Sequence, residues 1–279
     1  MILDAHQHFW KYNKEKHSWI NDEMSVIRRD FLPEDLKPVY KQNGIEGCIA
    51  VQADQSLNEN EFLLNLAQKN TFINGVIGWV DFQDTEIEKY LEKYDDTSLM
   101  KGYRHVVQGE TDSMFLLRQS FLNGIKQLEK RELVYEILVF PHQLPSVLEF
   151  VKLFPKQQFV IDHIAKPYIK SGYIDAWALM MQAIAKYENV SCKISGIITE
   201  ADYKKWNIQD LIPYMNIVLE AFGTKRIMYG SDWPVCLVAG NYTQVLNVAK
   251  KFSEQLSKEE QNDFFYHNAQ KIYQLKKTF

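Results

Sequence analysis

The sequence predicts an α/β fold, a single-domain (β/α)8 TIM barrel over residues 1–279, from three observations. Eight short apolar or β-branched runs recur along the 279 residues, and segments of helical period separate them. The length suits eight such units, which need roughly 250 residues in a typical barrel. No stretch rich in Gly, Pro or Ser divides the chain. A doubly wound open sheet is the alternative, but the Gly-x-Gly-x-x-Gly turn of its dinucleotide-binding version does not follow the first run.

The expected strands are short and rich in Val and Ile, as buried parallel strands are. They are residues 2–6, 47–52, 75–80, 99–105, 134–140, 159–163, 190–195 and 226–231. Helices are expected where apolar residues recur three and four positions apart. The first expected helix begins with a capping signal at 58–61. The others are 115–129, 144–154, 175–187, 208–222, 242–252 and 257–273. Because strands and helices alternate, right-handed crossovers should make the strands parallel.

The segment 11–36, between the first two strands, is long for a connection in a barrel and carries Trp19. We expect it to cover the mouth of a site.

Composition and charge exclude several classes of partner. The net charge is −4 and the basic residues are scattered, so no face suits the phosphates of a nucleic acid. No apolar stretch approaches the length that spans a membrane, and the first residues do not resemble a secretion signal. Three cysteines that lie far apart favour a reducing compartment. We therefore expect a cytoplasmic protein with neither nucleic acid nor membrane as a partner. A homo-oligomer is compatible with the many Tyr and Phe residues, although core packing explains them more simply.

Residues with chemical potential follow the ends of the expected strands. The carboxyl ends of barrel strands meet at one rim, so side chains far apart in the sequence converge there. The stretches concerned are 6–8 (His-Gln-His), 101–105 (Lys-Gly-Tyr-Arg-His), 162–167 (Asp-His-Ile-Ala-Lys-Pro), 192–196 (Cys-Lys-Ile-Ser-Gly) and 230–234 (Gly-Ser-Asp-Trp-Pro).

His6 and His8 are two residues apart on a strand, so both side chains point to the same side. Asp232, on the last strand, would lie beside them in a closed barrel. Two imidazoles and one carboxylate commonly bind a divalent metal, and His163 could join them. By itself a His-x-His pair is a weak signal, and its two rings often have unrelated roles.

Asp232 has two interpretations. It could cap a turn between strand and loop, since Asp readily accepts backbone hydrogen bonds. It could also be a general base that takes a proton from attacking water and returns it to the leaving oxygen. The buried run before it and Trp233 after it favour the second. For His163, a catalytic role and a satisfied core position are equally compatible with its apolar surroundings.

The remaining candidates would bind substrate. Arg104 offers planar donors to a carbonyl or carboxylate, and His105 follows it on the same strand. Lys193 is a weaker candidate because its strand should be largely buried. Trp10 and Trp233 are candidates for an aromatic wall, although tryptophans more often pack in a core. His17, His142 and His267 have no converging partners.

These stretches together resemble the amidohydrolase superfamily, and within it the branch that opens L-fucono- and L-rhamnono-lactones. The resemblance extends from Asp4-Ala-His-Gln-His-Phe-Trp10 to Gly230-Ser-Asp-Trp-Pro-Val235 with the motifs in the expected order. It implies a hydrolase that opens a small aldonolactone from a deoxysugar, with Asp232 as the proton shuttle and Arg104 binding the substrate. His6, His8 and His163 would hold either the lactone carbonyl or one divalent ion such as zinc, which the branch does not strictly require. Lys101 lies early in its strand, so no two-metal centre is expected.

Two other functions remain open at the level of sequence. One is a metal-dependent decarboxylase of the same superfamily, which uses a similar set of histidines and an aspartate. The other is a non-catalytic barrel that binds a sugar acid. Ring size and sugar configuration are not specified by these motifs.

Overall fold

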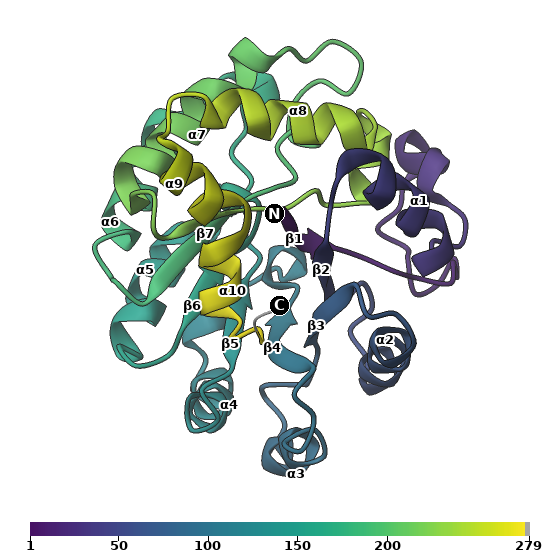
Figure 1. Ribbon diagram of the computed structural model, residues 1–279. Helices are drawn as coiled ribbons and strands as arrows, with labels where there is room; N and C mark the ends of the chain where they lie inside the picture. The colour runs from purple at the N-terminus through teal and green to yellow at the C-terminus, as the bar shows by residue number, and fades with distance from the viewer. Residues whose placement is uncertain (277–279) are drawn as a thin grey trace.

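The computed structural model describes residues 1–276, and within them the strands form one eight-stranded parallel sheet in the order β1 to β8. The strands are β1 (Leu3–Gln7), β2 (Gly47–Val51), β3 (Ile73–Gly78), β4 (Met100–His105), β5 (Val134–Ile137), β6 (Phe159–Ile161), β7 (Val190–Ile194) and β8 (Ile227–Tyr229). Figure 1 shows them in the middle of the molecule with helices around them. The predicted (β/α)8 barrel is confirmed.

The sheet closes where β1 meets the chain that follows β8. Gln7 forms a parallel bridge with Trp233. The amide of Asp232 donates to the carbonyl of His6 at 2.8 Å, and the amide of His8 donates to the carbonyl of Trp233 at 2.7 Å. The first and last strands are therefore neighbours, and the backbones that carry the histidine pair and the late aspartate are joined directly.

The helices cover the outside of the barrel and leave its carboxyl rim open. They are α1 (Pro33–Asn43), α2 (Leu57–Lys69), α3 (Ile87–Glu92), α4 (Gln119–Glu129), α5 (Leu144–Leu153), α6 (Asp175–Ile184), α7 (Ile208–Phe222), α8 (Tyr242–Ser253), α9 (Lys258–Asn262) and α10 (Asn268–Ile272). The sequence did not indicate α1 or α3. The expected helix 257–273 is α9 and α10 joined by the π-helical turn Asp263–His267.

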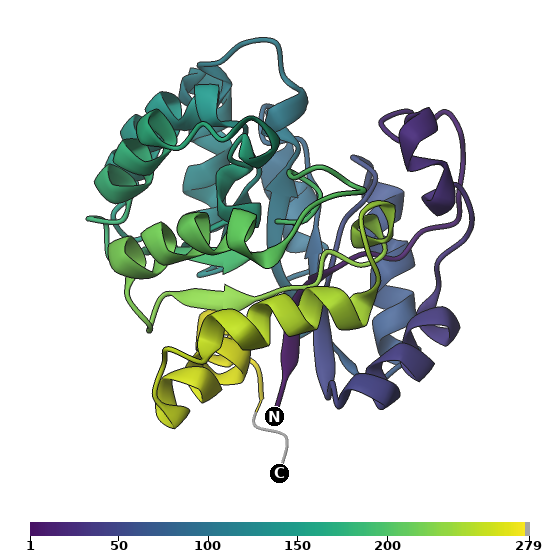
Figure 2. The ribbon, with the colours of Figure 1, turned by 90° about the horizontal axis from the view of Figure 1, so that it is seen from above.

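The two ends of the barrel differ in what fills them. At the amino end, Leu3, Val134 and Val160 pack with Tyr266 and Tyr273 of the C-terminal segment. Figures 1 and 2 show this yellow segment at the same end of the barrel as the N-terminus. The C-terminal segment therefore plugs the bottom of the barrel, while the top is left for a site.

Near the rim, one strand ends earlier than the sequence predicts, and the long segment after β1 contains a short helix. β6 ends at Ile161 rather than at residue 163, because the chain turns there into left-handed backbone. The segment 11–36 contains the short 3-10 helix Asp22–Ile27, drawn in purple at one side of Figure 2.

No helix in the described part of the chain is long and apolar enough to cross a bilayer.

Candidate active site

A cavity of about 350 Å³ opens at the carboxyl rim, and the side chains of His8, Arg104, His163 and Asp232 line it. They come from the residue after β1, from β4, from the turn after β6 and from the turn after β8. A larger hollow of about 700 Å³ lies at the opposite end, where its lining includes Lys101 but no histidine. The predicted convergence thus occurs at the smaller cavity, which holds the groups able to act on a substrate.

His6 and His8 point the same way, and their Nε2 atoms are 3.1 Å apart. The Nδ1 of His8 lies 2.8 Å from the carbonyl oxygen of Val51, which fixes the orientation of this ring. His6 is fully buried behind His8. Burial lowers the pKa of His6 well below its ordinary value, so the ring is neutral.

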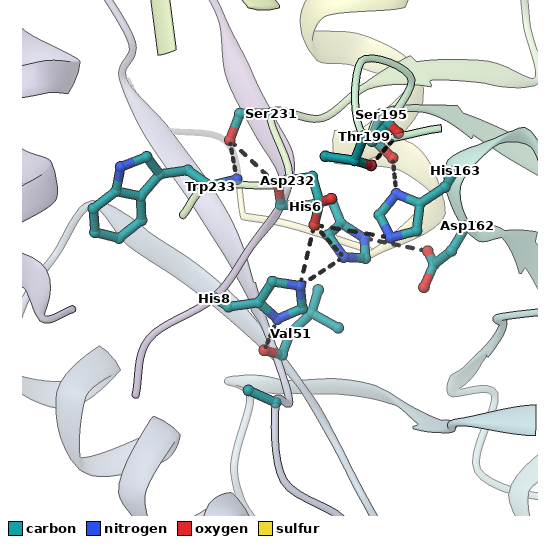
Figure 3. A network of polar contacts seen from close by, with 12 residues as sticks. His6, His8, Val51, Asp162, His163, Ser195, Thr199, Ser231, Asp232 and Trp233 are labelled. Carbon is teal, nitrogen blue, oxygen red and sulfur yellow. Dashed lines mark hydrogen bonds and ion pairs between the residues drawn. The ribbon is translucent and has the colours of Figure 1, made fainter. Parts of the chain in front are cut away.

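Asp232 lies among three imidazoles. Its Oδ1 is 3.4 Å from the Nε2 of His8 and 3.9 Å from the Nε2 atoms of His6 and His163. Figure 3 shows the rings grouped around the carboxylate. Burial by itself would raise the pKa of Asp232, but His163 and His8 more than offset it and hold the pKa below its usual value. The carboxylate is therefore ionised at neutral pH and can accept a proton.

Asp232 is held in place by backbone geometry and by a second aspartate. Its φ is +57°, a left-handed conformation that costs energy in a residue with a side chain. Asp4 accepts hydrogen bonds from the amide and hydroxyl of Ser231 at 2.8 and 2.6 Å, and from the hydroxyls of Tyr40 and Tyr242. The buried Asp4 carboxylate thereby fixes the turn that carries Asp232.

His163 begins four consecutive residues with positive φ, from His163 at +52° to Lys166 at +49°. This turn directs the ring across the rim, where its Nδ1 lies 2.9 Å from the hydroxyl of Ser195. Burial lowers the pKa of His163 to about 4, which leaves it neutral. Gly196 lies so close that a Cβ there would be 2.6 Å from the His163 Nδ1. A glycine is therefore required for the close approach.

Arg104 reaches the cavity from β4 and is almost completely buried. Its Nη1 donates to Asp162 Oδ2 at 2.9 Å and its Nη2 donates to the carbonyl of Gln52 at 2.6 Å. These acceptors hold the planar guanidinium at the cavity wall, where it can face a substrate oxygen.

A cluster of buried charges lies beneath His6. Lys193 donates to Glu136 Oε1 at 2.6 Å and lies 3.1 Å from Asp162 Oδ1. The hydroxyl of Tyr273, from the plug at the bottom of the barrel, also donates to Glu136 Oε1 at 2.7 Å. Sequence reasoning did not select Glu136 or Asp162. The sequence signal that could have indicated this cluster is a single carboxylate, Glu136, in one apolar strand and a single lysine, Lys193, in another.

Four of the predicted substrate-binding residues lie away from the cavity lining. Lys193 is fully buried beneath His6. His105 alternates with Arg104 and so points outward, where its Nε2 lies 2.7 Å from Glu110. Trp10 donates to the carbonyl of Arg29 at 2.8 Å and packs against Phe31. The ring of Trp233 also packs on Phe31, directed away from the imidazoles in Figure 3. These side chains therefore have packing or supporting positions.

The cavity walls come instead from loops. Trp19 and Met24, from the segment 11–36, line the cavity, so the segment contributes to its walls. Phe140 lines the cavity too, and Lys166 pairs with Glu200 at 2.8 Å on the same lining. The combination of apolar and charged walls suits a small polar molecule with one apolar side.

The arrangement also suits a divalent cation. His6, His8 and Asp232 offer ligand atoms that all lie within 4.8 Å of one another. Nitrogen and carboxylate ligands are typical of zinc. The contact of His8 Nδ1 with Val51 directs the His8 Nε2 toward the other two ligand atoms. Lys101 lies at the other end of the barrel, where its amine donates to the carbonyl of Gln274 at 3.3 Å. It is therefore far from a position that bridges two metals.

With this geometry established, comparison with known proteins identifies the family. The chain matches the amidohydrolase family over residues 3–275. It belongs to the amidohydrolase family. The predicted resemblance is confirmed.

Individual amidohydrolases are similar to this chain over nearly its whole length. An L-fucono-1,5-lactonase of Burkholderia multivorans is 34% identical over 98% of this chain and 96% of its own. An L-fucono-1,5-lactonase of Burkholderia ambifaria is 33% identical over 86% of this chain and 82% of its own. The crystal structure of a Burkholderia multivorans amidohydrolase with bound Zn has a TM-score of 0.96 and 33% identity, and covers 99% of this chain and 100% of that one.

Proposed function

We propose that this amidohydrolase hydrolyses the ring ester of a sugar-derived aldonolactone, such as an L-fuconolactone, with Asp232 as the proton shuttle. The observation that carries the proposal is an ionised carboxylate beside the neutral rings of His6 and His163, with an arginine on the same cavity wall. The lactonases named above support the substrate class, because they are similar to this chain over most of its length.

The mechanism begins with a water molecule between Asp232 and the lactone carbonyl. Asp232 takes one proton as the water oxygen forms its bond to the carbonyl carbon. Negative charge then develops on the carbonyl oxygen, where Arg104 and His163 can face it from the cavity lining. Donors that are fixed before the reaction stabilise such charge effectively, because they need no rearrangement.

Ring opening follows when the bond between the carbonyl carbon and the ring oxygen breaks. Asp232 returns its proton to that oxygen, so that the product is an open hydroxy acid. A divalent cation, when bound by His6, His8 and Asp232, would polarise the carbonyl and acidify water. Both proton transfers depend on the carboxylate of Asp232, and we propose that a cation is not required for them.

A panel of aldonolactones, including L-fucono-1,5-lactone, tests the substrate class through acid release at weakly buffered pH. Asp232→Asn keeps the shape of the side chain and removes the base, and we expect the rate to fall about 10²–10⁴-fold. Asp22→Asn is the matched control, because the Asp22 side chain is 98% exposed. Hydrolysis that survives in Asp232→Asn would show that the proposed shuttle is wrong.

Two further outcomes separate the other functions of this fold. Release of carbon dioxide from a carboxylic acid, without hydrolysis of any lactone, would identify a decarboxylase. Binding of sugar acids without turnover would identify a binding barrel. We expect exhaustive chelation to leave lactone hydrolysis largely intact, and complete loss that zinc restores would contradict this.

A further inference from the structure

The environment of His6 Nδ1 carries an inference about how the histidine pair is protonated. Two charged groups lie against this nitrogen, at the inner side of the ring. Lys193 Nζ is 3.1 Å away in hydrogen-bonding geometry, and Asp162 Oδ1 is 3.3 Å away. Lys193 and Asp162 are both fully buried, so solvent cannot replace either of them.

An ammonium group has three N–H donors and no lone pair. It can therefore approach His6 Nδ1 at 3.1 Å only if that nitrogen is unprotonated and accepts. Asp162 Oδ1, at 3.3 Å from the same nitrogen, is not in hydrogen-bonding geometry with it, which agrees with an Nδ1 that has no proton to donate. A protonated imidazolium would also direct an N–H at this ammonium, so the contact implies a ring whose single N–H is at Nε2.

The other histidine has the opposite arrangement. His8 Nδ1 lies 2.8 Å from the carbonyl oxygen of Val51, and because a carbonyl only accepts, this Nδ1 carries the proton. The Nε2 of His8 faces the N–H of His6 and must supply a lone pair to accept it. The two Nε2 atoms are 3.1 Å apart, so the N–H of His6 meets the lone pair of His8. Figure 3 shows His6 between His8 and Asp162.

The reverse tautomer of His6 explains the contacts less well. It would turn an N–H toward the Lys193 ammonium and set two lone pairs against each other at 3.1 Å. Its gains are an N–H directed at Asp162 Oδ1 at 3.3 Å and an acceptor for Arg104 Nη1 at 3.4 Å, both longer than the 3.1 Å contact with Lys193, and this Arg104 nitrogen already donates to Asp162 at 2.9 Å.

We propose that Lys193 is a positioning residue that holds His6 as its Nε2–H tautomer and so closes the His6–His8 pair as a hydrogen-bonded relay. The relay runs from Lys193 through His6 and His8 to the carbonyl of Val51. In this state the two Nε2 atoms do not jointly offer lone pairs to a cation. The inference rests on the proposed function only in that it concerns the same active site.

Metal binding through both histidines then requires a change of tautomer. The His6 proton must move from Nε2 to Nδ1, where it would face Asp162, and the hydrogen bond from Lys193 must break. A carboxylate beside a ligating histidine normally favours that tautomer. Lys193 opposes it, and in this way keeps the affinity of the site for zinc low.

The test compares two variants that differ only in Lys193. Glu136→Gln retains the ammonium, whereas Glu136→Gln combined with Lys193→Met removes it together with its buried counter-charge. The readout is the protonated nitrogen of His6 in metal-free protein with labelled histidines, from long-range proton–nitrogen correlation spectra. His6→Gln assigns its signals among the seven histidines. Zinc affinity is measured by titration calorimetry on the same two variants.

We expect Nε2–H in the wild-type protein and in Glu136→Gln, and Nδ1–H in the double variant. We also expect zinc to bind the double variant about tenfold more tightly or better, which corresponds to about 1.4 kcal/mol. An Nδ1–H tautomer in the wild type, a doubly protonated His8 or equal zinc affinities would each overturn the proposal. If the double variant does not fold, the wild-type spectrum decides. Neither readout depends on lactone hydrolysis, so the proposed function can fail independently.

Discussion

Replacement of Gly196 by alanine tests whether the spacing between His163 and Asp232 controls activity. Gly196 has φ +59°, and an added Cβ would lie 2.6 Å from His163 Nδ1 and 3.1 Å from Asp232 Oδ2. Gly172 provides a matched control. Its φ is +71°, but an added Cβ would meet nothing within 4 Å. Both variants strain the backbone, and only Gly196→Ala disturbs the site.

The two variants should have similar backbone costs and different activities. Left-handed backbone costs an alanine about 1–2 kcal/mol in stability at either position. At Gly196 the distance from the added methyl group to His163 Nδ1 must also increase from 2.6 Å to an ordinary contact of about 3.4 Å, which displaces the His163 ring by about 0.8 Å. A misplacement of about 1 Å costs on the order of 10²-fold in rate. We expect that loss in Gly196→Ala and near-normal turnover in Gly172→Ala.

The assay is the initial rate of hydrolysis of the best lactone, together with the melting temperature of each variant. The melting temperatures show how much of any loss comes from unfolded protein. If Gly196→Ala is folded and stays within about threefold of the wild-type rate, the argument from spacing is refuted. An equal loss of activity in Gly172→Ala would refute it as well, because backbone strain alone would then account for the effect.

Three further changes have distinct expected outcomes. Arg104→Lys keeps the charge, but a lysine cannot reach both acceptors, Asp162 and the carbonyl of Gln52. We expect kcat/KM to fall at least about tenfold and the free energy of unfolding to fall by about 1–3 kcal/mol. An unchanged kcat/KM would contradict a role in charge stabilisation. Trp19→Ala, at the cavity wall, should raise KM with little effect on the melting temperature. Trp10→Ala, in the core, should instead lower the free energy of unfolding by about 3–5 kcal/mol. A raised KM in Trp10→Ala with a loss of stability in Trp19→Ala would show that the wall is misassigned. Burial raises the pKa of Glu59 from 4.5 to about 7, so the folded state binds this proton more tightly than the unfolded state. Stability relative to Glu59→Gln should therefore fall as pH rises from about 4.5 to 7, by at most about 3 kcal/mol, in urea unfolding at several pH values; a parallel pH dependence in the two proteins would contradict the shift.

The fold could be predicted because strand and helix patterns act locally. Apolar runs marked every strand of the barrel, and the rule that barrel sites lie at strand ends placed His6, His163 and Asp232 on one rim. Helix α1 was missed because its polar sequence, with Pro38 inside it, gives little helical signal. The early end of β6 was missed because left-handed backbone at non-glycine residues has no simple sequence signature.

The functions of individual rim residues were harder to predict, because they depend on the direction in which each side chain points. His105 and Arg104 are adjacent, but they face opposite sides of the sheet, and only Arg104 reaches the cavity. Trp10 is near His8 in sequence, yet its ring turns into the core beneath Phe31. Lys193 was expected to touch substrate. It is instead buried beneath His6, because the fold brings Glu136 and Asp162, from two other parts of the chain, beside its amine.

The contact of Tyr273 with Glu136 has a consequence for how the protein is made. His6 is synthesised before Glu136, Asp162 and Lys193, whereas Asp232 and Tyr273 are synthesised after them. Domains are synthesised from the N-terminus, so the growing polypeptide carries Glu136, Asp162 and Lys193 long before the closing strand and the final tyrosine are available. The burial of these charges is therefore completed only after Tyr273 has been synthesised, and a product that stops short of residue 273 leaves Glu136 without its hydroxyl donor.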